Sequence, residues 1–217
     1  MLVPLNPQRL AIECNMIIGV TGSLSTGKSA AAGYLASYLK CRLIDADRIA
    51  HLALTKDKTY KLIISAFGRA ILDKKGAIDR VKLAEKVFNR RADLKKLCDI
   101  LHPLVISGIK KSIKDIYKKK GSAFVIVEAP LLIEAGFNKE CDRVVVVMAS
   151  LINQLERAEN QKGLKPRDAL NRIRAQMPLF EKAGYADYII GNDGSLKELS
   201  EKCGKLARDL KKSKGGR

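Results

Sequence analysis

The chain of 217 residues contains no tryptophan, and aromatic residues make up only 5% of it. Proteins that bind single-stranded nucleic acid stack bases on aromatic side chains, so this composition gives such a role little support. The five cysteines include no C-x-x-C pair, which argues against a zinc site and a disulfide framework. No uncharged apolar run approaches the roughly 18 residues that a membrane-spanning helix needs. These absences favour a protein of the reducing cytoplasm that does not enter a membrane.

Acidic residues are also scarce relative to basic ones. The chain has 23 Asp and Glu against 41 Lys and Arg, which gives a net charge of +18. This excess suits a ligand that carries several phosphates, and it equally suits RNA or DNA. Much of it lies in residues 110–120 and in the basic tail 211–217, which are expected to form a solvated helical face and a frayed chain end. Charge alone therefore does not identify the ligand.

Short apolar runs rich in β-branched residues predict five β-strands. They are residues 16–21, 41–45, 123–127, 143–148 and 187–190. Segments with helical spacing lie between them, and this alternation predicts a mostly parallel five-stranded sheet with helices on both faces. The fold class is therefore α/β.

Two helical segments interrupt the predicted α/β core. Residues 55–121 form a helical insertion, in which Pro103 is expected to cause a kink or to begin a new helix. Residues 151–183 form a second helical excursion. The core is then expected to consist of residues 16–54, 122–150 and 184–210, and residues 1–15 to form a disordered N-terminal extension.

A phosphate-binding loop follows the first predicted strand. Its sequence satisfies G-x-x-x-x-G-K-[ST] directly before a helical segment, which is the setting in which this motif binds nucleotide phosphates. The loop is expected to aim backbone N–H groups at the phosphates, Lys28 to neutralise the β- and γ-phosphate oxygens, and Ser29 to ligate Mg²⁺. The expected phosphate-binding residues are Gly22, Ser23, Leu24, Ser25, Thr26, Gly27, Lys28, Ser29 and Ala30.

Polar residues also end the other predicted strands, where ligands bind in open α/β sheets. Asp47 is a candidate to take a proton from an attacking hydroxyl, although Asp45 and Asp47 could both cap the next helix. Glu128 resembles an acid that holds magnesium at the end of a strand. Asn192 is either a turn residue or an adenine contact, and we count it among the candidate nucleotide-binding residues.

Together with the phosphate loop, six further segments make the chain resemble the dephospho-coenzyme A kinase family. The resemblance runs from Met16 to about Leu210. The six segments are I-D-A-D at Ile44–Asp47, L-H-P-L at Leu101–Leu104, P-L-L-I-E at Pro130–Glu134, Q-L-E-R at Gln154–Arg157, Arg172–Ile173 with Gln176, and A-D-Y-I-I at Ala186–Ile190 leading into Asn192–Gly194. Their order and spacing carry the resemblance.

The resemblance implies a P-loop NTPase fold and a Mg²⁺-dependent transfer of the γ-phosphoryl group of ATP to the ribose 3′-hydroxyl of dephospho-coenzyme A. Asp47 would accept or orient the proton of that hydroxyl, with Lys28 and Arg157 as the other catalytic residues. Residues 55–121 would bind the coenzyme, and residues 151–183 would form a lid that brings Arg157 over the phosphates. The implied acceptor-binding residues are Asp47, His102, Pro130, Leu131, Leu132 and Glu134, and the implied metal-binding residues are Ser29 and Glu128. On the bare sequence, His102 reads as a residue at a helix boundary, and the acceptor-binding role comes from the resemblance.

The chain departs from the family pattern at three places. Ser23, Ser25 and Ala30 stand where the family usually has two glycines and a threonine, and Glu128 stands in place of an aspartate. Gln161 replaces a second lid arginine. Either Arg157 carries the lid alone, or a neighbouring cation from Lys162, Lys165 and Arg167 supplies the missing charge.

Two other functions remain open on sequence grounds. One is a kinase of the same fold that acts on a nucleoside or nucleotide. The other is a basic ATPase or binding module that depends on nucleic acid, which the net charge favours and the low aromatic content opposes. The absence of an N-K-x-D motif argues against a GTPase.

Overall fold

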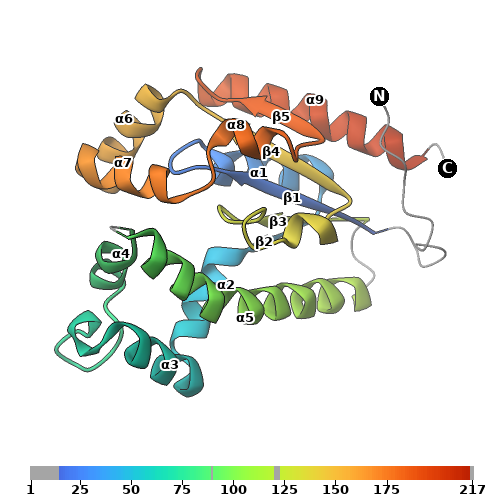
Figure 1. Ribbon diagram of the computed structural model, residues 1–217. Helices are drawn as coiled ribbons and strands as arrows, with labels where there is room; N and C mark the ends of the chain where they lie inside the picture. Colours follow the sequence, from blue (N-terminus) through green and yellow to red (C-terminus); the bar gives the residue numbers. More distant parts are fainter. Residues whose placement is uncertain (1–14, 89, 120–122, 216–217) are drawn as a thin grey trace.

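A parallel five-stranded sheet forms the middle layer of the computed structural model, which describes residues 15–88, 90–119 and 123–215 (Figure 1). The strands are β1 (Met16–Gly22), β2 (Arg42–Asp45), β3 (Phe124–Glu128), β4 (Arg143–Met148) and β5 (Tyr188–Gly191). Their spatial order is β2-β3-β1-β4-β5, and every neighbouring pair is parallel. All five strands thus lie within one residue of the ranges that the apolar runs predict.

The position of β1 explains where a ligand binds. The chain leaves β1 toward β2 on one side of the sheet and later reaches β4 on the other side, so the strand order reverses at β1. In open α/β sheets, the crevice at the carboxyl ends of the strands beside such a reversal is the usual binding site. The phosphate loop begins at this point.

Helices α1 (Lys28–Leu39) and α9 (Leu196–Gly215) cover one face of the sheet (Figure 1). Leu35 of α1 and Leu199 of α9 pack there against Ile18 and Val20 of β1. The other face is covered by the second half of α5 (Arg91–Lys118) and by the 3₁₀ turn η2 (Phe137–Glu140). Burial on both faces explains why the central strands are almost wholly apolar.

The insertion contains α2 (Ala46–Leu54), α3 (Asp57–Phe67), the 3₁₀ turn η1 (Arg69–Ile71), α4 (Arg80–Phe88) and the first half of α5. Figure 1 shows α3 and α4 projecting away from the sheet. Buried apolar side chains form a separate core for this part, among them Ile63, Phe67, Leu83, Val87 and Leu94. A second hydrophobic core lets the insertion hold its own shape beside the sheet.

The structure adds two details to the expectations about these helices. Of the two alternatives expected at Pro103, a kink or a new helix, the second is excluded, because α5 runs through Pro103 as one element. Its second half, with Ile109 and Ile113, packs on the sheet and belongs to the core rather than to the insertion. Helix α5 therefore packs in both the insertion and the α/β core.

The second helical excursion consists of α6 (Leu151–Lys162), α7 (Pro166–Ala175) and α8 (Leu179–Ala183). A small apolar cluster joins it to the phosphate loop, because Leu24 of the loop packs with Ala158 of α6 and Ala169 of α7. The loop and the α6–α7 segment therefore share one small hydrophobic core.

The structure describes most of the C-terminal end of the chain but little of the N-terminal end. The expected N-terminal extension lies outside the described residues except for Asn15. Helix α9 continues to Gly215, so residues 211–215 of the expected tail are helical, and Lys211 Nζ donates a hydrogen bond to the Tyr38 carbonyl at 2.8 Å. Cys41, Cys98, Cys141 and Cys203 are free thiols. Within the described ranges, no helix combines the length and hydrophobicity that crossing a bilayer requires.

Candidate active site

The phosphate loop makes its tight turn with two residues in the left-handed region of backbone space. Gly27 has φ 89°, and Ser25, which has a side chain, has φ 55°. The Thr26 hydroxyl donates a hydrogen bond to the Ser23 carbonyl at 3.2 Å, which closes the turn from inside. Helix α1 begins at Lys28, so its N-terminal N–H groups and positive dipole end face the loop. The geometry is that of an anion-binding cradle.

Asn192, which follows β5, braces this loop. Its buried side-chain amide donates a hydrogen bond to the Thr26 carbonyl at 2.8 Å. It lies so close to Gly27 that a Cβ at that position would clash with Nδ2. The structure thus supplies a third role for Asn192 beside the turn and the adenine contact, because its side chain fixes the backbone of the loop.

Lys28, Ser29 and Glu128 lie together at the ends of β1 and β3. The Ser29 hydroxyl donates a hydrogen bond to Glu128 Oε1, and burial raises the pKa of Glu128, against the lowering effects of that hydrogen bond and of Lys28. Magnesium prefers oxygen ligands and is commonly held by one or two carboxylates together with substrate phosphates. A serine hydroxyl and a carboxylate in contact beside a phosphate cradle fit that ion. Among the described residues there is no larger cluster of potential metal ligands.

Asp45 and Asp47 have different environments although they are two residues apart. Asp45 is the N-cap of α2, and its carboxylate accepts a hydrogen bond from the Arg48 backbone N–H at 3.0 Å. Asp47 lies in the first turn of α2 and lines a cavity beside Lys28. Burial raises the pKa of Asp47, and the nearby charge of Lys28 opposes that effect. The capping role therefore belongs to Asp45, and the Asp47 side chain stays accessible from the cavity.

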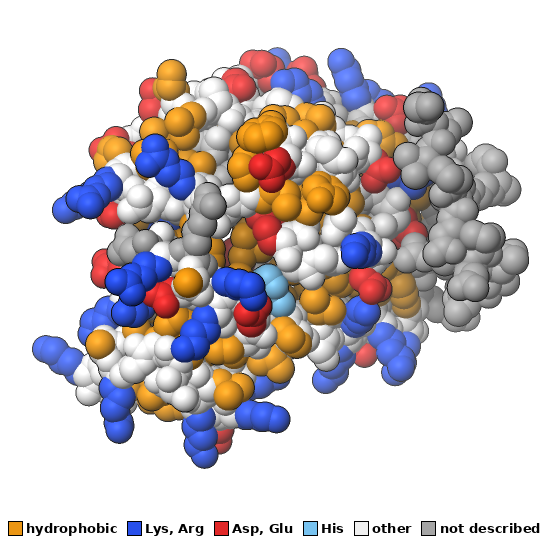
Figure 2. All heavy atoms as spheres, in the orientation of Figure 1, with side chains coloured by type: hydrophobic (Ala, Val, Ile, Leu, Met, Phe, Trp, Pro, Cys, Tyr) orange, Lys and Arg blue, Asp and Glu red, His pale blue; other side chains and the backbone are white. Residues whose placement is uncertain are grey.

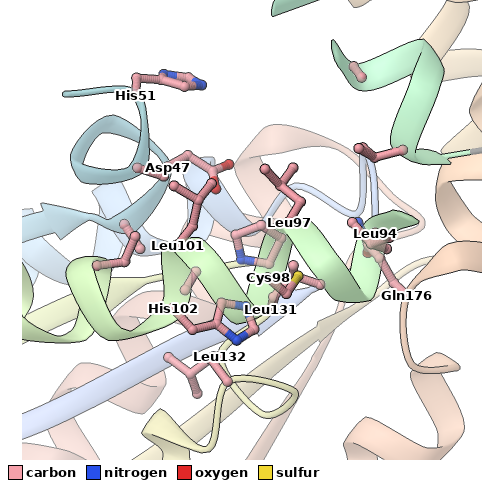
Figure 3. A pocket seen from close by; sticks show the side chains of 18 of the residues that line it. Asp47, His51, Leu94, Leu97, Cys98, Leu101, His102, Leu131, Leu132 and Gln176 are labelled. Atoms are coloured by element: carbon pink, nitrogen blue, oxygen red, sulfur yellow. The ribbon is translucent and has the colours of Figure 1, made fainter. Parts of the chain in front are cut away.

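This cavity has a volume of about 710 Å³ and lies between the phosphate loop, the insertion and α6–α7. Figure 2 shows the surface hollowed between these parts, with Lys and Arg side chains nearby. Figure 3 shows how side chains from α2, α5 and the segment after β3 surround the cavity. Its volume is within the range of small-molecule sites, about 300 to 1,000 Å³.

The two ends of the cavity differ in chemistry. Near the phosphate loop its wall carries Lys28, Asp47, Lys162 and Arg172, whereas α5 contributes apolar side chains such as Leu97. His102 lines it from α5, and burial lowers the pKa of this histidine, so the neutral imidazole is favoured at pH 7. Two shielded atoms, Nε2 of His102 and Oε1 of Gln176, have no hydrogen-bond partner among the described residues. The cavity thus joins a charged end to an apolar end that contains a few polar groups.

The segment after β3 forms part of the same wall. Pro130, Leu131 and Leu132 line the cavity, but Glu134 faces the other way and forms an ion pair with the fully buried Lys182, with Oε1 and Nζ 3.0 Å apart. The Met177 backbone N–H also donates a hydrogen bond to Glu134 Oε1 at 3.0 Å. Lys182 Nζ donates a further hydrogen bond to the Pro130 carbonyl. These contacts connect the β3 segment to α8 and to the segment that follows α7.

Three cations of the α6–α7 segment occupy different places. Arg157 is partly buried near Asp193, where its charge is a minor contributor to the lowered pKa of that carboxyl, behind the hydrogen bonds from Ser150 and Asn153. The Arg172 guanidinium lies over the Phe88 ring of α4, 5.3 Å from its centroid. Lys162 ends α6 and lines the cavity with Lys28 and Asp47. Arg157 does not appear among the described residues that line it.

Comparison with known proteins identifies the family to which this chain belongs. The family model for dephospho-CoA kinase matches residues 16–198. The chain belongs to the dephospho-CoA kinase family. It is 41% identical over 186 residues to the dephospho-CoA kinase of Carboxydothermus hydrogenoformans, covering 85% of this chain and 89% of that one. It is 37% identical over 194 residues to the dephospho-CoA kinase of Aquifex aeolicus, covering 89% and 96%.

Solved structures agree with this membership. A dephospho-CoA kinase from Campylobacter jejuni superimposes with a TM-score of 0.62 at 32% identity, covering 91% of this chain and 98% of that one. A crystal structure from Thermus thermophilus superimposes with a TM-score of 0.73 at 30% identity, covering 90% and 97%. The predicted family and the P-loop NTPase fold are therefore confirmed, and so is the kinase class of enzyme that the family represents.

The structure brings most of the family's expected site residues together and adds others. Lys28, Asp47, His102 and the Pro130–Leu132 segment share one cavity, whereas Glu134 and Asn192 hold backbone segments in place behind it. Sequence reasoning did not single out Arg80, His51 or Lys182. His51 could have been found, because it lies four residues after Asp47 and hence on the same face of α2. Lys182 gave no signal, because a lysine in an amphipathic segment reads as a surface residue.

Proposed function

We propose that the chain transfers the γ-phosphoryl group of ATP to the 3′-hydroxyl of the ribose in dephospho-coenzyme A, which yields coenzyme A and ADP. The observation that carries the proposal is the position of Asp47. Its carboxylate lies on the wall of a cavity that begins at Lys28 of the phosphate cradle and continues into the insertion. A donor phosphate and an acceptor hydroxyl can therefore meet beside a carboxylate.

The reaction assigns a role to each of these groups. The 3′-oxygen of the acceptor forms a bond to the γ-phosphorus while the bond from that phosphorus to the β–γ bridging oxygen breaks, and ADP leaves. The hydroxyl proton passes to the Asp47 carboxylate. Lys28, and Arg157 as a cation of the lid, stabilise the negative charge on the phosphoryl oxygens, which is the main requirement of phosphoryl transfer. The raised pKa of Asp47 makes it a better proton acceptor than an ordinary aspartate.

The apolar part of the cavity supports an acceptor that is larger than a simple nucleoside. Leu97 and Leu101 of α5 and Leu131 and Leu132 of the β3 segment lie there with His102 (Figure 3). Dephospho-coenzyme A combines an adenosine and a diphosphate with a long arm of methylene and amide groups. A site with both a cationic and an apolar end matches that composition.

Ser29 and Glu128 would hold a magnesium ion at the β- and γ-phosphates. The ion would neutralise part of the charge on these phosphates. Glu128 has one methylene more than the aspartate usual in the family, so its carboxylate reaches Ser29 directly from the last position of β3. Free thiols in the described part of the chain fit a reducing compartment, and we place the enzyme in the cytoplasm.

An acceptor panel tests the proposal. ADP release from Mg-ATP is measured with dephospho-coenzyme A, adenosine, AMP and single-stranded RNA, each at the same concentration. We expect release to depend on dephospho-coenzyme A. A rate with adenosine or AMP that exceeds the rate with dephospho-coenzyme A would favour a nucleoside or nucleotide kinase, and stimulation by RNA alone would favour a nucleic-acid-dependent ATPase.

A further inference from the structure

The cavity concentrates positive charge that the protein itself does not neutralise. Its wall carries four side chains that are normally positively charged and one carboxylate. The four are Lys28, Arg80, Lys162 and Arg172, and the carboxylate is Asp47. Like charges brought together in a cavity repel one another, so this arrangement is unfavourable until an anion enters. Three of these cations are already assigned to a part of the structure. Lys28 belongs to the phosphate loop, Arg80 belongs to the insertion, and Arg172 contacts Phe88. No such assignment has yet been given to Lys162.

Lys162 lies at the carboxyl end of α6 and lines the cavity together with Lys28 and Asp47. It is the last residue of α6, and Gly163 ends the helix with φ 61°. The structure records no ion pair or hydrogen bond between its ammonium and any described residue. A long, flexible side chain at a helix end can move toward an anion without any change in the backbone.

Its electrostatic neighbours identify the part of the cavity that Lys162 faces. Burial lowers the pKa of Lys162, and Lys28 and Arg172 lower it further, while Asp47 and Glu128 oppose these effects. Lys28, Asp47 and Glu128 are the groups that surround the γ-phosphate in the proposed reaction. Lys162 and Asp47 also affect each other, because the charge of Lys162 is a minor influence that opposes the burial-driven rise in the pKa of Asp47. The other titratable or charged groups on the cavity wall are His51, Arg80, Cys98 and His102.

We propose that Lys162 is the second phosphate-contacting cation of the lid, and that it supplies at the γ-phosphate the charge which Gln161 cannot supply. The inference rests on the proposed function and adds a residue to it. It divides the lid between two cations, with Arg157 on the Asp193 side of the phosphate loop and Lys162 on the Asp47 side. The role requires a positive charge, and only its pH dependence is particular to lysine, because an ammonium can lose its proton at alkaline pH and a guanidinium cannot.

The test compares Lys162→Ala and Lys162→Arg with two matched controls nearby, Gln161→Ala in the last turn of α6 and Lys165→Ala at the N-cap of α7. Both control residues are exposed, and neither lines the cavity. With dephospho-coenzyme A as acceptor, we expect Lys162→Ala to lower kcat by about a hundredfold, the usual effect of removing one charge-stabilising group, and to change the KM for ATP much less. Lys162→Arg should keep most of the activity, and each control should stay within about twofold of the wild type.

The pH profile distinguishes a phosphate contact from a structural role. Because the pKa of Lys162 is lowered in the free enzyme, kcat/KM for ATP should fall at a lower pH than an ordinary lysine would allow. Lys162→Arg should move that alkaline limb to higher pH, since arginine stays charged. A lysine that only stabilises the carboxyl end of α6 would leave the limb in place.

The inference is overturned if Lys162→Ala retains kcat within about threefold of the wild type, or if Lys162→Arg leaves the alkaline limb unchanged. Thermal unfolding of each variant, followed by circular dichroism, verifies that it is folded. A wild-type protein that forms no coenzyme A would instead contradict the proposed function, so the two failures can be told apart.

Discussion

Asp47 and Asp45 illustrate how two identical side chains, two positions apart, acquire different tasks. The turn that begins α2 gives Asp45 the capping hydrogen bond and leaves Asp47 on the cavity wall. A carboxylate already used as a cap is a poor proton acceptor, because its oxygen is stabilised in the charged form. The difference arises from local backbone geometry rather than from residue type.

The substitution Asp47→Asn tests this division of labour. We expect kcat to fall by about two orders of magnitude or more, while the affinity for ATP changes little, because a proton acceptor is lost and no phosphate contact is. Asp45→Asn is the matched control, since asparagine also caps helices well, and it should retain most of kcat. Nucleotide affinity is measured by isothermal titration calorimetry. A collapse of ATP binding in Asp47→Asn with turnover preserved would show that Asp47 is a ligand of the nucleotide or its metal.

The dependence of activity on acid follows from the same residue. Burial raises the pKa of Asp47, and Lys28 opposes it. The carboxylate accepts a proton only when it is ionised, so activity is present above the pKa in the free enzyme and is lost as the pH falls through it. We therefore expect the acid limb of kcat/KM to lie above the usual range of aspartate, and Asp47→Asn to abolish that limb. An acid limb within the usual aspartate range would contradict the assignment.

At the scale of elements, the ion pair between Glu134 and Lys182 determines how the β3 segment joins α8. Glu134 Oε1 accepts from the Met177 backbone and pairs with Lys182, whose Nζ also donates to the Pro130 carbonyl. The lysine is fully buried, and burial lowers its pKa against the influence of Glu134. The pair thus fixes the backbone on which Leu131 and Leu132 reach the cavity.

Breaking this pair on one side should destabilise the protein more than removing it on both sides. We expect Lys182→Met to lower the free energy of unfolding by about 3 kcal/mol, because it leaves the Glu134 carboxylate without its counter-ion. The double variant with Glu134→Gln should recover part of that loss. Urea denaturation of both single variants and the double variant completes the thermodynamic cycle. Strictly additive losses would show that the two side chains do not depend on each other.

The elements also show which features a sequence can predict. Apolar runs of four to six residues located all five strands, because burial on both faces of the sheet leaves a continuous β-branched pattern. The phosphate loop was predicted from the fixed positions of its glycine and lysine residues. The buried Lys182 and the brace from Asn192 to Thr26 could not be predicted, since both depend on contacts between segments far apart in the chain. Lys162 stood among three possible lid cations until the fold placed it on the cavity wall.

At the scale of the whole molecule, the sheet, the insertion and the α6–α7 segment meet around one cavity. Arg172 of α7 contacts Phe88 of α4 across it, and Leu24 of the phosphate loop packs with Ala158 and Ala169. The two helical segments are thus tied to each other and to the phosphate cradle. Binding of a phosphate-rich ligand by cations from all three parts would draw them together, as closure requires.

The net charge of +18 fits this arrangement without a nucleic-acid partner. Several of the cations lie on the cavity wall, where ATP and a second phosphate-containing substrate would meet them. Others, such as Lys110, lie on exposed helical faces, where Lys110 pairs with Glu140. The excess of positive charge therefore combines a ligand site with an ordinary solvated surface.

The central claim is tested most directly by following the transferred group itself. The protein is incubated with Mg²⁺, dephospho-coenzyme A and ATP that carries ¹⁸O at its non-bridging γ-oxygens, and the products are analysed by mass spectrometry with fragmentation. The account predicts ADP and coenzyme A in equal amounts, with the label in the 3′-phosphate of the ribose. Label recovered only in inorganic phosphate, or unchanged dephospho-coenzyme A beside consumed ATP, would contradict it.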